Sequence, residues 1–185
     1  VDVLFQGYFQ SLLVLLGNGI LTDKNNPYNF SRTQDGFGTL GAPYISSLVC
    51  EVAQNALRTV WFQKWCVHRR LRPEVFGGRI YQVLRNKAAY PVHTEILDSL
   101  TSADRLGKYL PEKNGLLPIA FPEGSPTHPS YGAGHATVAG ACVTILKAFF
   151  DEDKFIFGPL VPDSKGTALS PYIEYDAAKL TVGGE

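Results

Sequence analysis

The chain has 185 residues, of which 45% are hydrophobic and 18% charged, as expected for one folded domain or a large part of one. Lysine plus arginine and aspartate plus glutamate both number 17, so the net charge gives no argument for binding nucleic acid or an anionic membrane. No apolar run is long enough to cross a bilayer. The three cysteines (Cys50, Cys66 and Cys142) form no CxxC pair and lie in apolar stretches, so we expect reduced, inert core residues.

Helical periodicity recurs along the chain and strand signals are sparse, so the predicted fold class is mainly α. A first helix is expected over about residues 5–16, before Gly17-Asn18-Gly19 ends it. Residues 25–43, rich in Asn, Gly, Ser and Pro, are expected to form a long loop. The strongest helix follows Pro43, because apolar residues recur there at three- and four-residue steps. They are Ile45, Leu48, Val49, Val52, Ala53, Ala56, Leu57, Val60, Trp61 and Trp65.

The second half of the chain predicts shorter helices joined by loops. One helix is expected over about residues 74–87 and another near residues 95–100. A Pro/Gly-rich stretch, residues 111–129, leads to a helix that starts at about His135. Residues 157–170 are expected to be loop, and the last residues to begin another helix. Helices packed on helices are the expected architecture.

Lys64 is the first candidate for chemistry. It lies three residues after Trp61 and four after Val60, in line with the apolar stripe of its helix. A lysine that faces inward needs an anionic partner or must lose its proton, because an unpaired buried charge is costly. Taken alone, Lys64 favours the simpler interpretation that its stem lies on the core while its ammonium reaches water.

A basic segment follows and ends at Arg72, which Pro73 biases away from the helical region. The Arg72 guanidinium offers fixed donors for an oxyanion, and Lys64 adds a compact charge. The other basic residues of the segment are His68, Arg69 and Arg70. The segment could instead be a nucleic-acid patch or a solvated helix end. A single cluster in a neutral chain, without interleaved exposed aromatics, argues against nucleic acid.

Residues 127–136 place a glycine-rich turn before a helix. Glycines let the backbone approach a ligand, and the amides of a first helical turn point at it. His135 stands at that start, where it could touch an anion and exchange protons with a substrate. Each feature alone has an ordinary explanation, either a common helix start or a hydrogen-bonded structural histidine.

The three features together resemble a signature shared by vanadium haloperoxidases and a class of acid phosphatases, which bind vanadate or phosphate in the same kind of pocket. The motifs at residues 61–65 (WFQKW) and 67–74 (VHRRLRPE) are similar to those of algal and cyanobacterial bromoperoxidases. So is the run at residues 126–136 (PTHPSYGAGHA). The resemblance covers the whole chain and implies a helical bundle of the vanadium haloperoxidase and acid phosphatase type, incomplete in this chain.

Carried over by position, the resemblance implies a role for each site residue. Lys64 and Arg72 would bind equatorial oxygens of vanadate, with the amide of Gly134 beside them. His135 would be the acid–base that takes a proton from hydrogen peroxide. His128 matches a second histidine that would tune the site. The catalytic residues would thus be His135, Lys64 and His128.

The chain departs from the family pattern at two points. The family commonly has Ser before the Gly-His pair, whereas this chain has Ala133, which removes one hydrogen bond worth about 1–2 kcal/mol of anion binding. The family's second arginine and its vanadium-bonding histidine come later, and the residues after His135 include neither Arg nor His. We therefore expect the axial histidine to lie outside this chain, and residues 1–185 to be part of a single domain truncated at both ends.

The implied reaction is the oxidation of bromide or iodide by hydrogen peroxide to hypohalous acid, which halogenates a small organic acceptor. Vanadium would act as a Lewis acid of constant oxidation state, and Trp61 would lie on the halide side. Two alternatives are an acid phosphatase of the related superfamily and a non-catalytic helical fragment. The resemblance implies vanadate as cofactor and allows calcium, for which no ligands can be named. It also implies a homo-oligomer at full length, in an extracellular or wall-associated location, without nucleic-acid or membrane partners.

Overall fold

The computed structural model describes residues 4–102, 106–110, 112–156, 158–173 and 180–183. It divides into two compact units. The first unit comprises Val1–Thr59 and Gly134–Glu185, and the second comprises Val60–Ala133. The expectation of a single domain stays a prediction.

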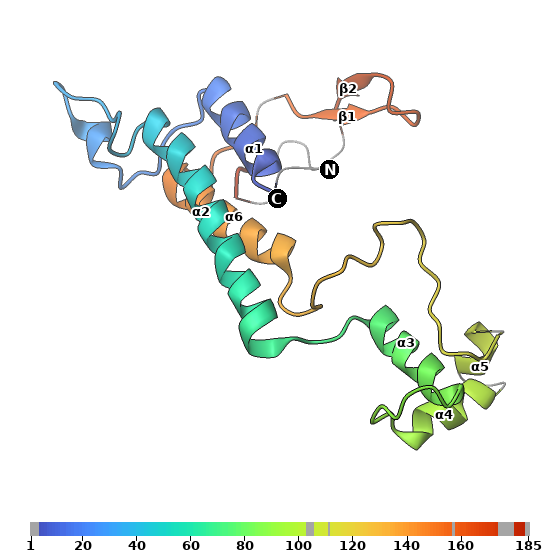
Figure 1. Ribbon diagram of the computed structural model, residues 1–185. Coiled ribbons are helices and arrows are strands. Elements are labelled where there is room, and N and C mark those ends of the chain that lie inside the picture. The colour runs from blue at the N-terminus through green and yellow to red at the C-terminus, as the bar shows by residue number, and fades with distance from the viewer. Residues whose placement is uncertain (1–3, 103–105, 111, 157, 174–179, 184–185) are drawn as a thin grey trace. The chain divides into compact units, whose positions relative to one another are not determined.

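The core of the first unit is built from α1 (Gln6–Gly17), the first part of α2 (Ala42–Phe62) and α6 (Gly134–Phe149) (Figure 1). Its buried residues come from all three helices and recur every three or four positions along α2 and α6, so each of these two helices turns one apolar face inward. These residues are Leu12, Ile45, Val49, Ala53, Val138, Cys142, Leu146, Phe149 and Phe150. The helices predicted here from periodicity are confirmed. No helix among the described residues combines the length and apolarity needed to cross a bilayer.

The expected loop before α2 contains a short 3₁₀ helix, η1 (Pro27–Phe30). The Asn26 side chain accepts a hydrogen bond from the Tyr28 amide at 3.0 Å and so caps this turn. Helix α2 begins one residue before Pro43, because proline is well tolerated in the first helical turn.

The expected loop over residues 157–170 is partly wrong, because strands β1 (Leu160–Pro162) and β2 (Leu169–Pro171) pair antiparallel with Val161 opposite Ser170. Both carboxylate oxygens of Asp163 accept hydrogen bonds from Thr167, at 2.7 and 2.8 Å, which closes the turn. Strands of three residues are too short for an alternating pattern to reveal.

The chain after β2 was expected to begin a helix. Residues 174–179 and 184–185 of that prediction lie outside the described residues. Residues 180–183 are not helical; the Ile156 amide donates to the Leu180 carbonyl at 3.0 Å, and the Val182 amide donates to the Lys154 carbonyl at 2.9 Å.

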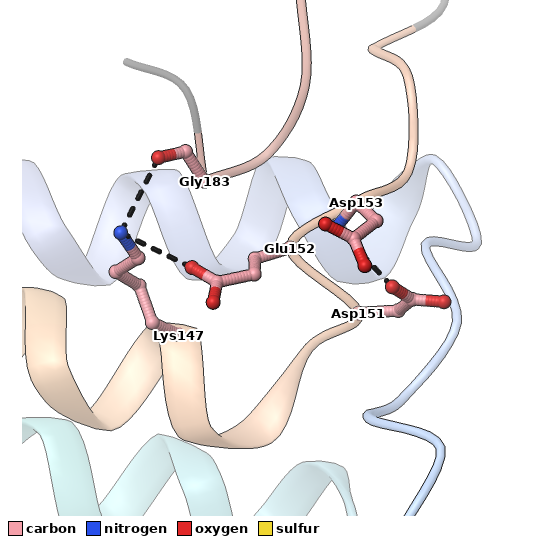
Figure 2. Close-up of polar contacts among 5 residues, drawn as sticks. All are labelled: Lys147, Asp151, Glu152, Asp153 and Gly183. Carbon is pink, nitrogen blue, oxygen red and sulfur yellow. Dashed lines mark hydrogen bonds and ion pairs between the residues drawn. The ribbon is translucent and has the colours of Figure 1, made fainter.

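Lys147 of α6 anchors this last described segment (Figure 2). Its Nζ lies 3.1 Å from a Glu152 carboxylate oxygen and donates to the Gly183 carbonyl at 3.3 Å. The Gly183 amide donates to the Glu152 carbonyl at 2.9 Å, and a Cβ at Gly183 would come within 2.6 Å of Glu152 Cβ. The ion pair is half exposed and contributes little, so the backbone hydrogen bonds do most to hold the segment, and the space beside Gly183 admits no side chain.

The second unit contains the end of α2, the π-helical turn η2 (Gln63–His68), and helices α3 (Pro73–Leu84), α4 (Thr94–Thr101) and α5 (Leu106–Tyr109). Helices α3 and α4 confirm the predictions, whereas α5 is too short for its periodicity to be seen. Gly115 has φ +81°, and a Cβ there would come within 2.6 Å of Ile80 Cγ2, so this position requires glycine.

Three sequence expectations fail in the second unit. Trp61 and Trp65 were assigned to the buried stripe, but their exposed fractions are 51% and 53%. Cys66 was expected in the core and is exposed, whereas Cys142 is buried as expected and Cys50 is half-buried. After Val60, the inward-facing position of the helix is occupied by Lys64 instead of the tryptophans.

The core of the first unit generates a stability prediction. Leu12 is fully buried, and its neighbour Leu13 has an exposed fraction of 51%. Replacing Leu12 with Ala should lower the free energy of unfolding by about 2–5 kcal/mol, because it removes buried methyl groups and leaves a cavity. Leu13→Ala is the matched control and should change it by less than about 1 kcal/mol. Urea unfolding followed by circular dichroism measures both, and equal losses would contradict this packing.

Candidate functional site

The local fold around Lys64 starts where α2 gives way to η2. The Arg69 amide donates to the Lys64 carbonyl at 2.9 Å, a five-residue spacing that defines the π turn. Arg69 has φ +44°, and this left-handed residue ends the helix. Arg72 is extended before Pro73, with ψ 153°, as the proline predicts. Such π turns are frequent at functional sites.

A loop of residues 126–131 runs along residues 64–72. The Ser130 amide donates to the Arg70 carbonyl at 3.0 Å, and the Ser130 hydroxyl donates to the Leu71 carbonyl at 2.9 Å. We call residues 64–72 and 126–131 together the clasp. Because both Ser130 bonds go to backbone atoms, they hold the two segments together without using a basic side chain.

Two side-chain contacts close the clasp at its ends. The Nε of Arg72 donates to the Pro126 carbonyl at 3.1 Å. The His68 and Tyr131 rings meet edge to face with their centroids 4.8 Å apart. Arg72 therefore uses its Nε–H to bind the loop, and its two terminal nitrogens remain as donors for a ligand.

Lys64 lies inside the clasp. Its exposed fraction is 3%, and its Nζ donates to the Pro129 carbonyl at 2.9 Å and lies 3.2 Å from His128 Nδ1. The simpler interpretation, an ammonium in water, is therefore wrong, and the inward orientation is confirmed. His128 Nδ1 also lies 3.1 Å from the Pro129 carbonyl oxygen, so the donor or acceptor role of this nitrogen toward Lys64 follows the tautomer of the ring.

The surroundings of Lys64 in the clasp disfavour the charged form of its side chain. Burial lowers the pKa of Lys64 below its ordinary value, and the positive charge of Arg72 lowers it further. Neither side chain forms an ion pair within the described residues. A bound oxyanion would offset both effects, because it supplies negative charge to a buried ammonium and a nearby guanidinium. This cationic donor set fits a tetrahedral oxyanion such as vanadate.

Glu74 is the acid closest in sequence to Arg72. Hydrogen bonds from its own backbone amide and from the Ser125 side chain lower the pKa of Glu74, and Arg72 adds a smaller effect. The carboxylate is therefore ionised at neutral pH, and its hydrogen bonds are made at the start of α3 and not with Lys64.

Gly134 and His135 belong to the first unit, where they are the first two residues of α6. A Cβ at Gly134 would lie 3.9 Å from Leu57 Cδ1, an ordinary contact, so the packing described within this unit does not itself demand glycine. His135 is exposed at the start of the helix. The structure thus brings Lys64, Arg72 and His128 together in the second unit, and Gly134 and His135 together in the first.

Some contributors to the clasp were not predicted from the sequence. They are the carbonyls of Pro126 and Pro129 and the side chain of Ser130. Every residue has a backbone carbonyl, so the residue types at positions 126 and 129 do not predict that their carbonyls bind Arg72 and Lys64. The predicted motif did contain Ser130, but its role in holding residues 70 and 71 depends on a contact across 59 or more residues.

Comparisons with known proteins agree with the resemblance. The chain is 44% identical over 172 residues to a vanadium-dependent bromoperoxidase of Corallina pilulifera, covering 81% of this chain and 28% of the relative. The vanadium-dependent bromoperoxidase of Corallina officinalis is 42% identical, over 82% of this chain and 29% of the relative. The vanadium-dependent bromoperoxidase of Ascophyllum nodosum is 34% identical, over 96% of this chain and 33% of the relative. No family model matches the chain.

A solved structure gives the same result. The homohexameric vanadate-dependent bromoperoxidase AnII of Ascophyllum nodosum matches with a TM-score of 0.70 and 30% identity, over 99% of this chain and 34% of that one. The mainly α fold is therefore that of the vanadium haloperoxidases. The chain belongs to the family of vanadium-dependent bromoperoxidases, whose cofactor is vanadate, and spans about a third or less of the length of these relatives.

No group of three or more His, Cys, Asp or Glu side chains within the described residues is arranged to hold a metal ion. Calcium therefore remains without assigned ligands.

The electrostatics of the clasp predict a measurable pKa change. Replacing Arg72 with Gln should raise the pKa of Lys64, because it removes a positive charge near the ammonium, while burial keeps the pKa below its usual value. Carbon-13 NMR of the lysine Cε signals over a pH series measures the shift. Arg85→Gln, an exposed change in the same unit, is the control. A Lys64 pKa that stayed constant in Arg72→Gln would show that Arg72 does not act on it.

Proposed function

We propose that this chain carries part of the active site of a vanadate-dependent bromoperoxidase, which oxidises bromide or iodide with hydrogen peroxide to hypohalous acid. The observation that carries the proposal is the buried Lys64, held with Arg72 in the clasp. It occurs in a chain that is 34–44% identical to bromoperoxidases. A buried cation beside a second cation is costly to a stable fold, and an oxyanion ligand explains its presence.

Each residue has a distinct task in this proposal. Lys64 and Arg72 bind vanadate oxygens through charged hydrogen bonds. The family resemblance adds the Gly134 amide as a further vanadate-binding group. His128, whose Nδ1 lies 3.2 Å from Lys64 Nζ, directs the ammonium through this contact. Bound vanadium(V) supplies a Lewis acid of constant oxidation state. Lys64 places positive charge where the peroxide oxygens become electron-rich as halide attacks.

His135 is the proposed acid–base. Its imidazole, exposed at the start of α6, would accept a proton from hydrogen peroxide as the peroxide binds. Trp61, half exposed in the second unit, is the proposed wall on the halide side. Its polarity and that of its neighbours would set the halide preference, with bromide the expected substrate.

The relatives' full activity needs groups that these 185 residues do not contain. In the family resemblance, a second arginine and the histidine that bonds vanadium follow the Gly-His pair, and no Arg or His follows His135 here. We therefore propose that the clasp binds vanadate but does not complete the catalytic site. A homo-oligomeric full-length protein, acting on a small organic acceptor outside the cell or in its wall, belongs to the same proposal, as does a single domain extending beyond these residues.

Vanadate binding by the purified chain tests the role of Lys64. Replacing Lys64 with Met should raise the dissociation constant for vanadate at least about tenfold, because it removes a charged hydrogen bond worth roughly 1.5–3 kcal/mol. Equilibrium dialysis with vanadate measures the constant. Lys87→Met, which removes the charge of an exposed lysine in the same unit, should leave it unchanged. Equal affinities for the two variants would argue against the proposed site.

Turnover tests the completeness of the site. The purified chain, given vanadate, hydrogen peroxide and bromide, should brominate a β-diketone probe no faster than a protein-free control, because the vanadium-bonding histidine is absent. An assembled bromoperoxidase of Corallina is the positive control. Rapid bromination by the chain would show that its own residues suffice. Hydrolysis of a phosphomonoester without peroxide would instead favour the acid phosphatase alternative.

A further inference from the structure

The basic segment carries more positive charge than the oxyanion site uses. Residues 52–73 contain five cationic residues and no Asp or Glu, within a chain whose opposite charges balance at 17 each. The five are Arg58, Lys64, Arg69, Arg70 and Arg72. Lys64 and Arg72 have assigned tasks, whereas Arg69 and Arg70 have none in the proposed function.

Arg69 and Arg70 sit at the solvent side of the clasp. Both residues are exposed, yet their backbones are fixed, because the Arg69 amide donates to the Lys64 carbonyl at 2.9 Å and the Arg70 carbonyl accepts from the Ser130 amide at 3.0 Å. Their positions are therefore tied to the same two segments that enclose the Lys64 ammonium.

The two guanidinium groups are also uncompensated. Among the described residues, the ion pairs belong to Lys147 with Glu152 and Lys154 with Asp151. Neither Arg69 nor Arg70 has a side-chain hydrogen bond or ion pair there. An exposed pair of unpaired cations beside a buried cation produces a positive potential, and this potential raises the local concentration of small anions.

We propose that Arg69 and Arg70 collect halide anions at the edge of the clasp. The inference rests on the proposed function, because it makes halide the substrate that must reach Lys64 and Arg72. It also separates the two substrates by charge: halide is an anion and is attracted, whereas hydrogen peroxide is neutral and is not. The positive potential of Arg69 and Arg70 thus raises the local concentration of halide and leaves that of hydrogen peroxide unchanged.

The chain contains its own reporters of halide concentration. Its two tryptophans, Trp61 and Trp65, lie within about two helical turns of Arg69, and their exposed fractions are 51% and 53%. Iodide quenches tryptophan fluorescence by collision and is itself a halide, whereas acrylamide quenches it without charge. The ratio of the iodide to the acrylamide quenching constant therefore measures the local enrichment of halide, with no need for vanadate or turnover.

The variant for this test is the double substitution Arg69→Asn and Arg70→Glu. Asn suits position 69 because it tolerates the φ of +44°. The matched control, Arg85→Glu with Lys87→Asn, changes the charge by the same three units at exposed positions of the same unit. It lies past α3, a helix of 12 residues and so about 18 Å long, well beyond the roughly 10 Å Debye length at 0.1 M salt.

At about 0.1 M salt, the double variant should lower the iodide to acrylamide ratio about twofold, and the difference should vanish near 1 M salt, where charges are screened within roughly 3 Å. The control should leave the ratio unchanged. An unchanged ratio in the double variant would overturn the proposal and leave Arg69 and Arg70 as solvated residues at a helix end.

Two further comparisons separate halide collection from other effects of the substitutions. A changed acrylamide quenching constant would show that the double substitution had altered the exposure of the tryptophans. In that case the single variant Arg70→Glu, which leaves the turn at Arg69 intact, would test the proposal by the same ratio of quenching constants. If the chain proves to be a phosphatase or inactive, the halide ratio still stands by itself. Loss of the proposed bromoperoxidase function and loss of halide collection are therefore separate outcomes.

Discussion

The buried ammonium of Lys64 is the interaction on which the second unit's functional geometry depends. A lysine with an exposed fraction of 3% must have its polar hydrogens satisfied, because an unsatisfied buried charge costs more than ordinary packing gains. The loop of residues 126–131 meets this requirement with the Pro129 carbonyl and His128 Nδ1. Placing that loop in turn positions the Pro126 carbonyl for Arg72. One buried cation thus accounts for the course of two distant segments.

The clasp satisfies the lysine's hydrogen bonds without neutralising its charge. Lys64 contacts a carbonyl oxygen and an imidazole nitrogen, and no carboxylate pairs with Lys64 or Arg72 within the described residues. A carboxylate partner would stabilise the empty site and compete with an anionic ligand. Burial lowers the pKa of Lys64, and the positive charge of Arg72 lowers it further. A site that is stable yet still positive can bind an oxyanion strongly, and this is the property that a vanadate enzyme requires.

The chain belongs to the bromoperoxidase family, and its candidate site residues fall into two groups. Lys64, Arg72 and His128 form one group, and Gly134 and His135 open α6 in the other unit. Hydrogen bonds from the Gly183 amide to the Glu152 carbonyl and from Lys147 of α6 to the Gly183 carbonyl hold the last described residues. The described contacts therefore place Lys64 and Arg72 as the cationic groups that the proposal assigns to vanadate.

The sequence by itself determined the helices of the core, the extended Arg72 before Pro73, and the identities of Lys64, Arg72 and His135 as candidates. Periodicity and proline geometry are local properties, so a single chain reveals them. Only the tertiary structure decided that Lys64 is buried and the neighbouring tryptophans exposed, against the expectation from the stripe. It also revealed the short β1–β2 hairpin and the carbonyls that hold Lys64 and Arg72. The hairpin strands have three residues each, too few for an alternating pattern. The carbonyl contacts of Lys64 and Arg72 join residues 65 and 54 positions apart, and such contacts leave no trace in local residue spacing.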